Sequence, residues 1–389
     1  MNASPQAARP AANKRKRALL GLLALFLAIG AGYVLYWLLV GRFYVSTDDA
    51  YVRGNLVAIT ARVSGTVETI RADDTDRVHQ GQVLIVLDPT DARILLQTRE
   101  AALAAAIRNA RATRARLTAL RAQAQAAYSL YAKAQGKVRR RAHLAVLHAI
   151  SAETWQDMQA NAQALHARYL SARAQARALA AIIGHGPIAR LPSIRIAAGG
   201  VVSAYTALAR CVVRAPVSGY VAKRSVQLGE HIAPGQPLMV VIPLHHLWIT
   251  ANFKEDDLGA LRIGQPAAVV TSLYGDSVSY HGHLIGIGAG TGSAFSILPP
   301  NNASGNWIRI VQRIPVRISL PAAALKAHPL RVGLSATATV NIHDTSGLML
   351  AARPPLEPAY RTAVYGHNAQ AAARIVHRIF RANGIHGDT

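Results

Sequence analysis

The stretch ARVSGTVETIRADDTDRVHQGQVLIVLDP, residues 61–89, recurs without a gap as APVSGYVAKRSVQLGEHIAPGQPLMVVIP, residues 215–243. Each copy alternates β-branched with polar residues and carries glycines where the chain must turn, which is typical of short β-strands joined in hairpins. A unit of 29 residues is marginal in water by itself, because it cannot bury its own apolar face. We therefore expect the two copies to pack on each other as one small domain.

Four glycines mark equivalent turn positions of the two copies. Gly65 aligns with Gly219, and Gly81 aligns with Gly235. Glycine adopts tight-turn conformations that a side chain would forbid, so these four positions are expected to shape the paired units. Since the copies must meet, the segment between them has to leave the domain and return to it.

The intervening segment, residues 90–210, has the pattern of an antiparallel helical hairpin. Apolar or small residues recur every seven positions on both arms, which predicts a coiled-coil seam. The outgoing seam is Leu96, Leu103, Ala110, Leu117, Ala124, Tyr131 and Val138, and the returning seam is Met158, Leu165, Ala172 and Leu179. At about 1.5 Å per residue, the outgoing arm would project about 80 Å. The returning arm is expected to break at residues 184–187 and to resume as a short helix near residues 194–209.

The N-terminal segment predicts a membrane anchor. Residues 18–40 carry no charge, and four basic residues, 14–17, precede them. The run is long enough to cross a hydrocarbon core of about 30 Å, and the positive-inside rule places residues 1–17 in the cytoplasm. A cleaved signal peptide is the alternative. The apolar run extends past a plausible cleavage site to Trp37, which favours an anchor that is retained.

Composition restricts the classes of function. The chain has 43 Lys and Arg residues against 19 Asp and Glu residues, a net charge of +24, yet 51% of it is hydrophobic. This excludes a disordered chain and leaves nucleic acid, an anionic membrane surface or an acidic protein as partners of the basic residues. The predicted topology places most of the chain in a compartment without DNA, and no zinc-finger or RNA-binding motif is evident. No nucleic-acid partner is therefore expected.

The remaining segments predict a second β domain and a tail. Residues 244–345 contain short alternating strands separated by turn residues, and residues 41–58 are expected to join them in a small antiparallel barrel. We expect the strand-like segment 51–59 to form one strand of that barrel. Residues 346–389 offer one basic amphipathic helix, which is expected either to lie on anionic lipid or to form a frayed tail.

No catalytic, cofactor-binding or metal site is predicted. Two histidine pairs, His245 with His246 and His281 with His283, lack an acidic or thiol third ligand nearby in the sequence. No nucleophile elbow or phosphate-loop spacing is present. The lone cysteine, Cys211, cannot form an internal disulfide and is expected to be a small buried apolar residue.

A split repeat around a helical hairpin, behind a single anchor, resembles the periplasmic adaptor, or membrane fusion, proteins of the HlyD type. Three stretches are similar to the EmrA-type multidrug subfamily: TDDAYVRGN at 47–55, ANFKEDDLGALRIGQPA at 251–267, and GTGSAFSILPPNNASGNWIRIVQRIPVRI at 290–318. The resemblance covers about residues 43–345. It implies an elongated multidomain α+β fold in which residues 59–89 and 211–243 form a split lipoyl-like domain. The turn after residue 87 offers no lysine for a lipoyl group, so no cofactor is expected.

The resemblance also implies a function. Such adaptors are not enzymes; they sit in the inner membrane of Gram-negative cells with most of the chain in the periplasm. They assemble into a ring, as a trimer or a hexamer, and link an inner-membrane transporter, here of the major-facilitator type, to an outer-membrane channel. The cargo would be drugs or toxic small molecules. An adaptor of an ABC-type exporter of a peptide or protein, and an anchored scaffold for acidic surface polymers, stay open as alternatives.

The family's hairpin tip carries the pattern Arg-x3-Leu-x6-Ser, and Arg140, Leu144 and Ser151 have this spacing at the midpoint of the hairpin. The resemblance implies that these residues dock to the channel: the leucine would fill a groove, the arginine would reach carbonyl or carboxylate groups, and the serine would cap the returning helix. The alternative is that Arg140 is solvated, Leu144 belongs to the seam, and Ser151 is only an N-cap.

Overall fold

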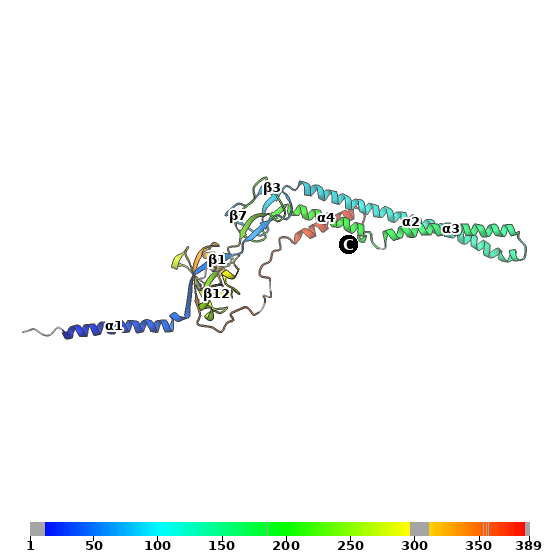
Figure 1. Ribbon diagram of the computed structural model, residues 1–389. Helices are drawn as coiled ribbons and strands as arrows, with labels where there is room; N and C mark the ends of the chain where they lie inside the picture. The colour runs from blue at the N-terminus through cyan, green and yellow to red at the C-terminus, as the bar shows by residue number, and fades with distance from the viewer. Residues whose placement is uncertain are drawn as a thin grey trace, which may run out of the picture.

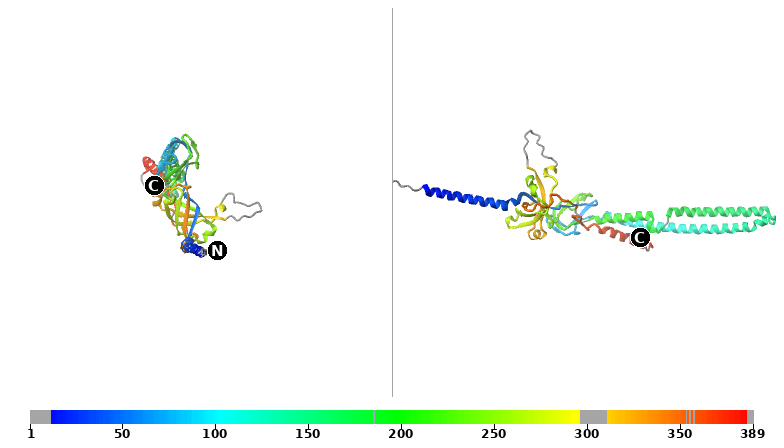
Figure 2. Two further views of the ribbon diagram at one scale, coloured as in Figure 1. Left: turned by 90° about the vertical axis from the view of Figure 1, so that its left-hand side faces the viewer. Right: turned by 90° about the horizontal axis from the view of Figure 1, so that it is seen from below.

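The computed structural model describes residues 12–184, 186–295, 311–352, 354, 356 and 358–385. These residues form a long molecule with a single apolar helix at one end, a helical hairpin at the other, and two β domains between them (Figure 1). The right-hand view of Figure 2 shows the same elongated arrangement from below, and the left-hand view looks along the long axis from the α1 end. The predicted fold class, an elongated multidomain α+β chain, is confirmed.

Helix α1, Ala12–Leu39, extends away from the rest of the chain. Its apolar span continues to Phe43, and none of the span is buried against other parts of the protein. A helix of 28 residues is about 42 Å long, which exceeds the hydrocarbon thickness of a bilayer. An exposed apolar surface of this length fits a single-pass anchor.

The domain next to α1 is a closed antiparallel barrel of six strands in the order β1-β10-β13-β12-β11-β14. The strands are β1 Tyr44–Gly54, β10 Leu247–Lys254, β11 Pro266–Thr271, β12 Ser279–Ile287, β13 Arg313–Ser319 and β14 Ser335–Asn341. Strand β10 alternates buried and half-buried residues, and its Ile249 and Phe253 are fully buried together with Tyr280 of β12. This alternation is what a barrel with a filled interior requires.

Short elements connect and cover the barrel and the hairpin. They are the helix α5 Ala322–Ala327 and the 3-10 turns η1 Gly41–Phe43, η2 Ile188–Arg190, η3 Glu255–Ala260, η4 Gly275–Ser277 and η5 Gly292–Phe295. Residues 296–310, which belong to one of the three family-like stretches, lie outside the described residues.

The lipoyl-like domain consists of two four-stranded sheets, ordered β2-β9-β7-β4 and β6-β5-β3-β8. The strands are β2 Val57–Thr60, β3 Gly65–Ile70, β4 Arg77–Val78, β5 Val83–Leu87, β6 Val212–Arg214, β7 Gly219–Arg224, β8 His231–Ile232 and β9 Pro237–Ile242. Each sheet contains strands of both sequence copies, and their side chains share one buried core. The expected packing of the two copies into one domain is confirmed.

The structure differs from the sequence prediction where the barrel meets the lipoyl-like domain. Segment 51–59 is not one barrel strand: β1 ends at Gly54, and β2 begins at Val57 and pairs with β9 of the lipoyl-like domain. Burial shifts by one residue at the junction, from the even positions Val52 and Gly54 to the odd positions Val57 and Ile59. The apolar run of residues 56–59 hides this shift in the sequence, so the pattern alone did not reveal that the chain changes sheets.

The hairpin consists of α2 Thr90–Val146, α3 Ala152–Ile183 and α4 Pro192–Arg210. Helix α2 packs against α3 in its outer part and against α4 near the lipoyl-like domain (Figure 1). The predicted seam residues are buried or half-buried in both long arms. The returning arm breaks as expected, and Gly184 ends α3 with a φ of +69°.

The C-terminal helix α6, His367–Ala382, differs from both alternatives considered for it. It packs on α4 and on α2 at the base of the hairpin (Figure 1). Ile379 and Phe380 are buried there in a cluster with residues of both helices, and Ile375 and Val376 pack against that cluster. The apolar face of α6 therefore completes a core at the hairpin base and is covered by protein.

Phe380→Ala is expected to loosen α6, because Phe380 is a buried member of the core that holds this helix and removing a buried phenylalanine typically costs about 3–5 kcal/mol. Amide hydrogen exchange of α6 in the full chain measures the effect. Arg381→Ala, on the exposed side of the same helix, is the matched control. Equal protection of α6 in the two variants would contradict this account.

Candidate functional site

The hairpin tip lies at the end of the molecule opposite α1 (Figure 1). Helix α2 ends at Val146, the chain turns, and α3 begins after Ser151. The Oγ of Ser151 accepts a hydrogen bond from the backbone N–H of Thr154 at 3.2 Å. The structure thus places Ser151 as the N-cap of α3, which satisfies one of the free N–H groups of its first turn.

The turn at the tip is a Schellman motif, which the sequence analysis missed. The N–H of Ala149 donates to the carbonyl of Leu144 at 2.9 Å, and the N–H of His148 donates to the carbonyl of Ala145 at 3.2 Å. His148 adopts a φ of +53°, a conformation in which glycine is the usual residue. Because the position is not glycine, the usual sequence signal for this helix end is absent.

The predicted tip residues differ in exposure and environment. Leu144 is half-buried, and the guanidinium of Arg140 lies beside Gly136 on its own helix. The most exposed apolar side chains of the tip are Val146 and Leu147, at 80% and 71%. The apex therefore presents an apolar surface next to a run of three arginines, and the docking role of Arg140, Leu144 and Ser151 stays a prediction.

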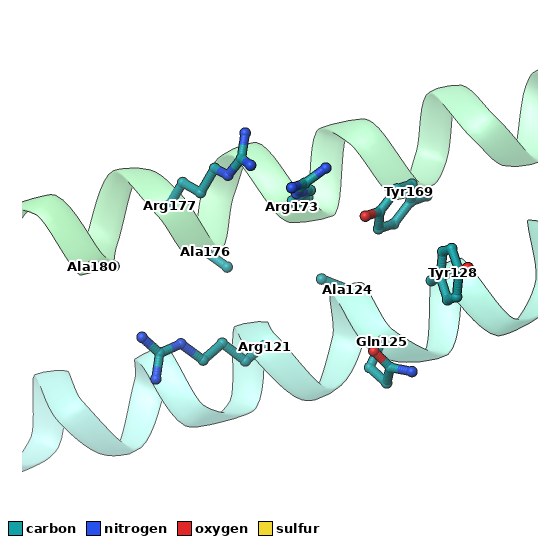
Figure 3. A pocket seen from close by; sticks show the side chains of 9 residues that line it. All are labelled: Arg121, Ala124, Gln125, Tyr128, Tyr169, Arg173, Ala176, Arg177 and Ala180. Atoms are coloured by element: carbon teal, nitrogen blue, oxygen red, sulfur yellow. The ribbon is translucent and has the colours of Figure 1, made fainter.

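A groove of about 460 Å³ lies between α2 and α3, further down the hairpin (Figure 3). Arg121 comes from α2, whereas Arg173 and Arg177 come from α3 one turn apart. At the other end, the rings of Tyr128 and Tyr169 lie 5.2 Å apart. None of these three arginines forms an ion pair with a carboxylate among the residues the structure describes. The groove is a cationic and aromatic surface.

Two of the four repeat glycines form reciprocal turns in the lipoyl-like domain. Gly81 and Gly235 have φ values of +84° and +89°. The backbone N–H of Gly81 donates to the carbonyl oxygen of Ala215 in the other copy at 2.8 Å. The backbone N–H of Gly235 donates to the carbonyl oxygen of Ala61 at 2.8 Å. The turn of each copy is therefore held by a hydrogen bond to the backbone of the other copy.

The other two glycines occupy different environments despite their equivalence in sequence. A Cβ at Gly219 would lie 2.4 Å from the carbonyl oxygen of Ile242, whereas a Cβ at Gly65 would meet Leu87 at an ordinary 3.4 Å. Close backbone approach therefore requires glycine at position 219, and position 65 has room for a methyl group.

Two titratable groups of the lipoyl-like domain, Asp73 and Cys211, have shifted pKa values with structural causes. The Nε of Arg224 donates to Asp73 Oδ1 at 2.7 Å, and this hydrogen bond lowers the pKa of the Asp73 carboxyl. Burial raises the pKa of the Cys211 thiol, which is 3% exposed, as expected for a small apolar residue. Within the described ranges, no group of three His, Cys, Asp or Glu residues is placed to hold a metal ion.

An anchored barrel, a lipoyl-like domain split by a hairpin, and a hairpin tip remote from the anchor together define the class of membrane fusion proteins. The family model described as "RND MFP, barrel-sandwich hybrid domain" matches residues 55–244. This range begins at the chain's entry into the lipoyl-like domain and ends after its last strand, β9.

The chain belongs to the EmrA-type family of membrane fusion proteins. It is 39% identical to the multidrug export protein EmrA of Escherichia coli (strain K12) over 349 residues, which are 90% of each chain. It is 41% identical to the fatty acid resistance protein FarA of Neisseria gonorrhoeae over 343 residues, 86% of this chain and 84% of FarA.

Solved structures of periplasmic adaptors are also similar. The structure of the periplasmic adaptor protein EmrA has a TM-score of 0.38 at 19% identity and covers 77% of this chain and 98% of that chain. MacA from Actinobacillus actinomycetemcomitans has a TM-score of 0.44 at 19% identity, with 77% and 79% covered.

Proposed function

We propose that this periplasmic adaptor links an inner-membrane transporter of the major-facilitator type to an outer-membrane channel for the export of drugs or other toxic small molecules. It has no enzymatic step of its own, and the transporter supplies the energy. Residues 1–17 lie in the cytoplasm, α1 crosses the inner membrane, and the domains after it extend through the periplasm.

The observation that carries this proposal is the separation of the anchor from the hairpin tip (Figure 1). Helix α2 alone has 57 residues, which is about 85 Å. A rod of this length, fixed to the membrane at its far end, suits a protein that spans an aqueous compartment. The names of EmrA and FarA, which refer to multidrug export and fatty acid resistance, support an amphipathic small-molecule cargo.

The charge of the hairpin supports an acidic partner. Residues 91–210 contain 18 basic and 4 acidic residues, a net charge of +14. The groove of Figure 3 concentrates three arginines that form no ion pair with a carboxylate of the described residues. Neighbouring hairpins in a ring of three or six copies would repel one another unless an acidic surface lies against them. We propose that the channel, or the channel together with the transporter, supplies that surface.

Photo-crosslinking in cells from a probe at position 146 tests the proposal, because Val146 is the most exposed large apolar side chain at the tip. An outer-membrane channel in the adduct is the expected result. A probe at Leu170, an exposed position of α3 remote from the tip, is the control and should capture the channel less efficiently or not at all.

Two other outcomes would favour the alternative functions. Loss of peptide or protein secretion in a deletion strain, with drug resistance intact, would favour an adaptor of an ABC-type exporter. Adducts with acidic surface polymer, and no channel adduct while the crosslinking controls work, would favour an anchored scaffold.

Ser151 permits a separate prediction that distinguishes capping from docking. Ser151→Ala is expected to destabilise the first turn of α3 by about 1 kcal/mol, because the cap hydrogen bond to Thr154 is lost. Ser151→Asp retains a capping oxygen and is expected to keep the turn intact. Hydrogen exchange of residues 152–156 measures the turn, and resistance of cells measures function. If Ser151→Asp loses function although the turn is intact, the hydroxyl itself contacts the channel.

A further inference from the structure

A small cavity lies where the lipoyl-like domain, the base of the hairpin and the C-terminal segment meet. Its volume is about 60 Å³, roughly the share of two water molecules in the liquid and well below the 300–1,000 Å³ of sites for drug-sized ligands. The lining comes from β2, the end of α4, β6 and the first turn of α6. This cavity belongs neither to the hairpin tip nor to the groove of Figure 3.

Three arginines line this cavity: Arg62, Arg210 and Arg214. No acidic residue lines it, and none of the three arginines forms an ion pair with a carboxylate among the described residues. The guanidinium of Arg62 lies over the ring of Tyr365 at 4.8 Å, and that of Arg214 donates to the carbonyl of Gly81 at 3.0 Å. Neither contact neutralises the positive charge.

Arg210 is half-buried. Its Nε is buried and has no hydrogen-bond partner among the described residues. A buried N–H donor without an acceptor is costly, and such groups in native proteins usually indicate a bound water or ion. Arg62 and Arg214 are exposed, so their side chains can turn toward a molecule in the cavity. Three arginines favour an anion over a water molecule there, because hydrogen bonds from a guanidinium to an anion are charge-assisted and stronger than those to water.

The N-terminus of helix α6 is a second, independent source of positive electrostatic potential at this cavity. Its first turn contains Asn368, which lines the cavity, and that turn has neither an acidic residue nor a capping side chain. The N-terminus of a helix of 16 residues carries free N–H groups and a partial positive charge, both of which favour an oxyanion.

From these features we propose that the cavity binds one small tetrahedral oxyanion, such as inorganic phosphate, through Arg62, Arg210 and Arg214. The anion would join three segments that are remote in sequence: the lipoyl-like sheets, the end of α4 and the start of α6. The barrel lies between this cavity and α1 (Figure 1), so a soluble anion, rather than a lipid headgroup of the anchoring membrane, is the occupant.

Calorimetric titration of inorganic phosphate into the full chain in neutral detergent, in chloride buffer, tests the proposal. One saturable site per chain is expected, together with slower hydrogen exchange at residues 362–370. Arg210→Gln is expected to weaken binding at least tenfold. Arg62→Gln should do the same and is the safer variant, because Arg62 is exposed and its replacement does not disturb a core.

Arg177→Gln is the matched control, since it removes the same charge from the groove of Figure 3. It should bind phosphate like the unsubstituted chain. The proposal is overturned if no saturable site is found. It is also overturned if Arg62→Gln and Arg210→Gln, both folded, bind as tightly as the control, since binding would then reflect only the net charge of the chain.

Discussion

Leu144→Asp is expected to abolish drug resistance while the amount of adaptor in the membrane stays unchanged. Under the proposed docking, the leucine fills an apolar groove of the channel, and a carboxylate there would be desolvated without a partner. Loss of an apolar side chain that fills a desolvated interface pocket typically costs about 2 kcal/mol or more, which is roughly a 30-fold loss of affinity. Resistance of cells, measured against immunoblots of the membrane fraction, gives the result.

Two controls separate docking from folding of the tip. Leu170→Asp places the same charge on an exposed leucine of α3 and should leave resistance unchanged. Leu144→Met keeps an apolar side chain of similar volume and should also retain function. The carbonyl of Leu144 closes the Schellman turn, so hydrogen exchange at residues 147–151 must be unchanged in Leu144→Asp. Full resistance in that variant would remove the docking role of Leu144.

Gly219→Ala is expected to be the most damaging single-methyl change in the lipoyl-like domain. The new Cβ would lie 2.4 Å from the oxygen and 2.7 Å from the carbon of the Ile242 carbonyl. Both atoms belong to the backbone of the neighbouring strand β9, so relief requires β7 and β9 to separate. Overpacking costs about 1–3 kcal/mol where side chains can adjust, and a backbone clash should reach or exceed the upper end of that range.

The other repeat glycines provide a graded set of controls. Gly65→Ala should change stability by less than about 1 kcal/mol, because its Cβ meets Leu87 at a normal distance. Gly235→Ala should cost about 1–2 kcal/mol, because its φ of +89° disfavours any side chain. Hydrogen exchange of β7 and β9 in the full chain measures how strongly each variant is destabilised. An equal response of Gly65→Ala and Gly219→Ala would contradict this account.

The regular elements could be predicted because their signals are periodic and local. The seven-residue repeat of residues 96–138 predicted a long α2, and the side chains of that repeat do face the other helices. The aligned copies at 61–89 and 215–243 predicted a shared core, and each sheet does contain strands of both copies. In both cases a stripe of apolar residues has only one way to avoid water, which is to pack on its counterpart.

The parts that were missed depend on contacts between distant segments. The tail helix α6 has an amphipathic pattern that suits a lipid surface as well as a protein surface, so its docking on α2 and α4 could not be read from that pattern. The tip turn uses His148 where glycine is the usual signal. The change of sheets at Asn55 was missed because four consecutive apolar residues, 56–59, hide the one-residue shift in the buried face.

The anchor, the split repeat, the hairpin and the family resemblance could be inferred from the residues alone, because hydrophobic periodicity or extended sequence similarity reveals each of them. The folded structure was needed to show that a side chain at Gly219 would clash with backbone, that α6 packs on α2 and α4, and that Arg62, Arg210 and Arg214 share one cavity. The physical reason is distance along the chain. Periodicity reports on neighbours within a helix or strand, whereas backbone clashes and clustered charges arise between residues that only folding brings together.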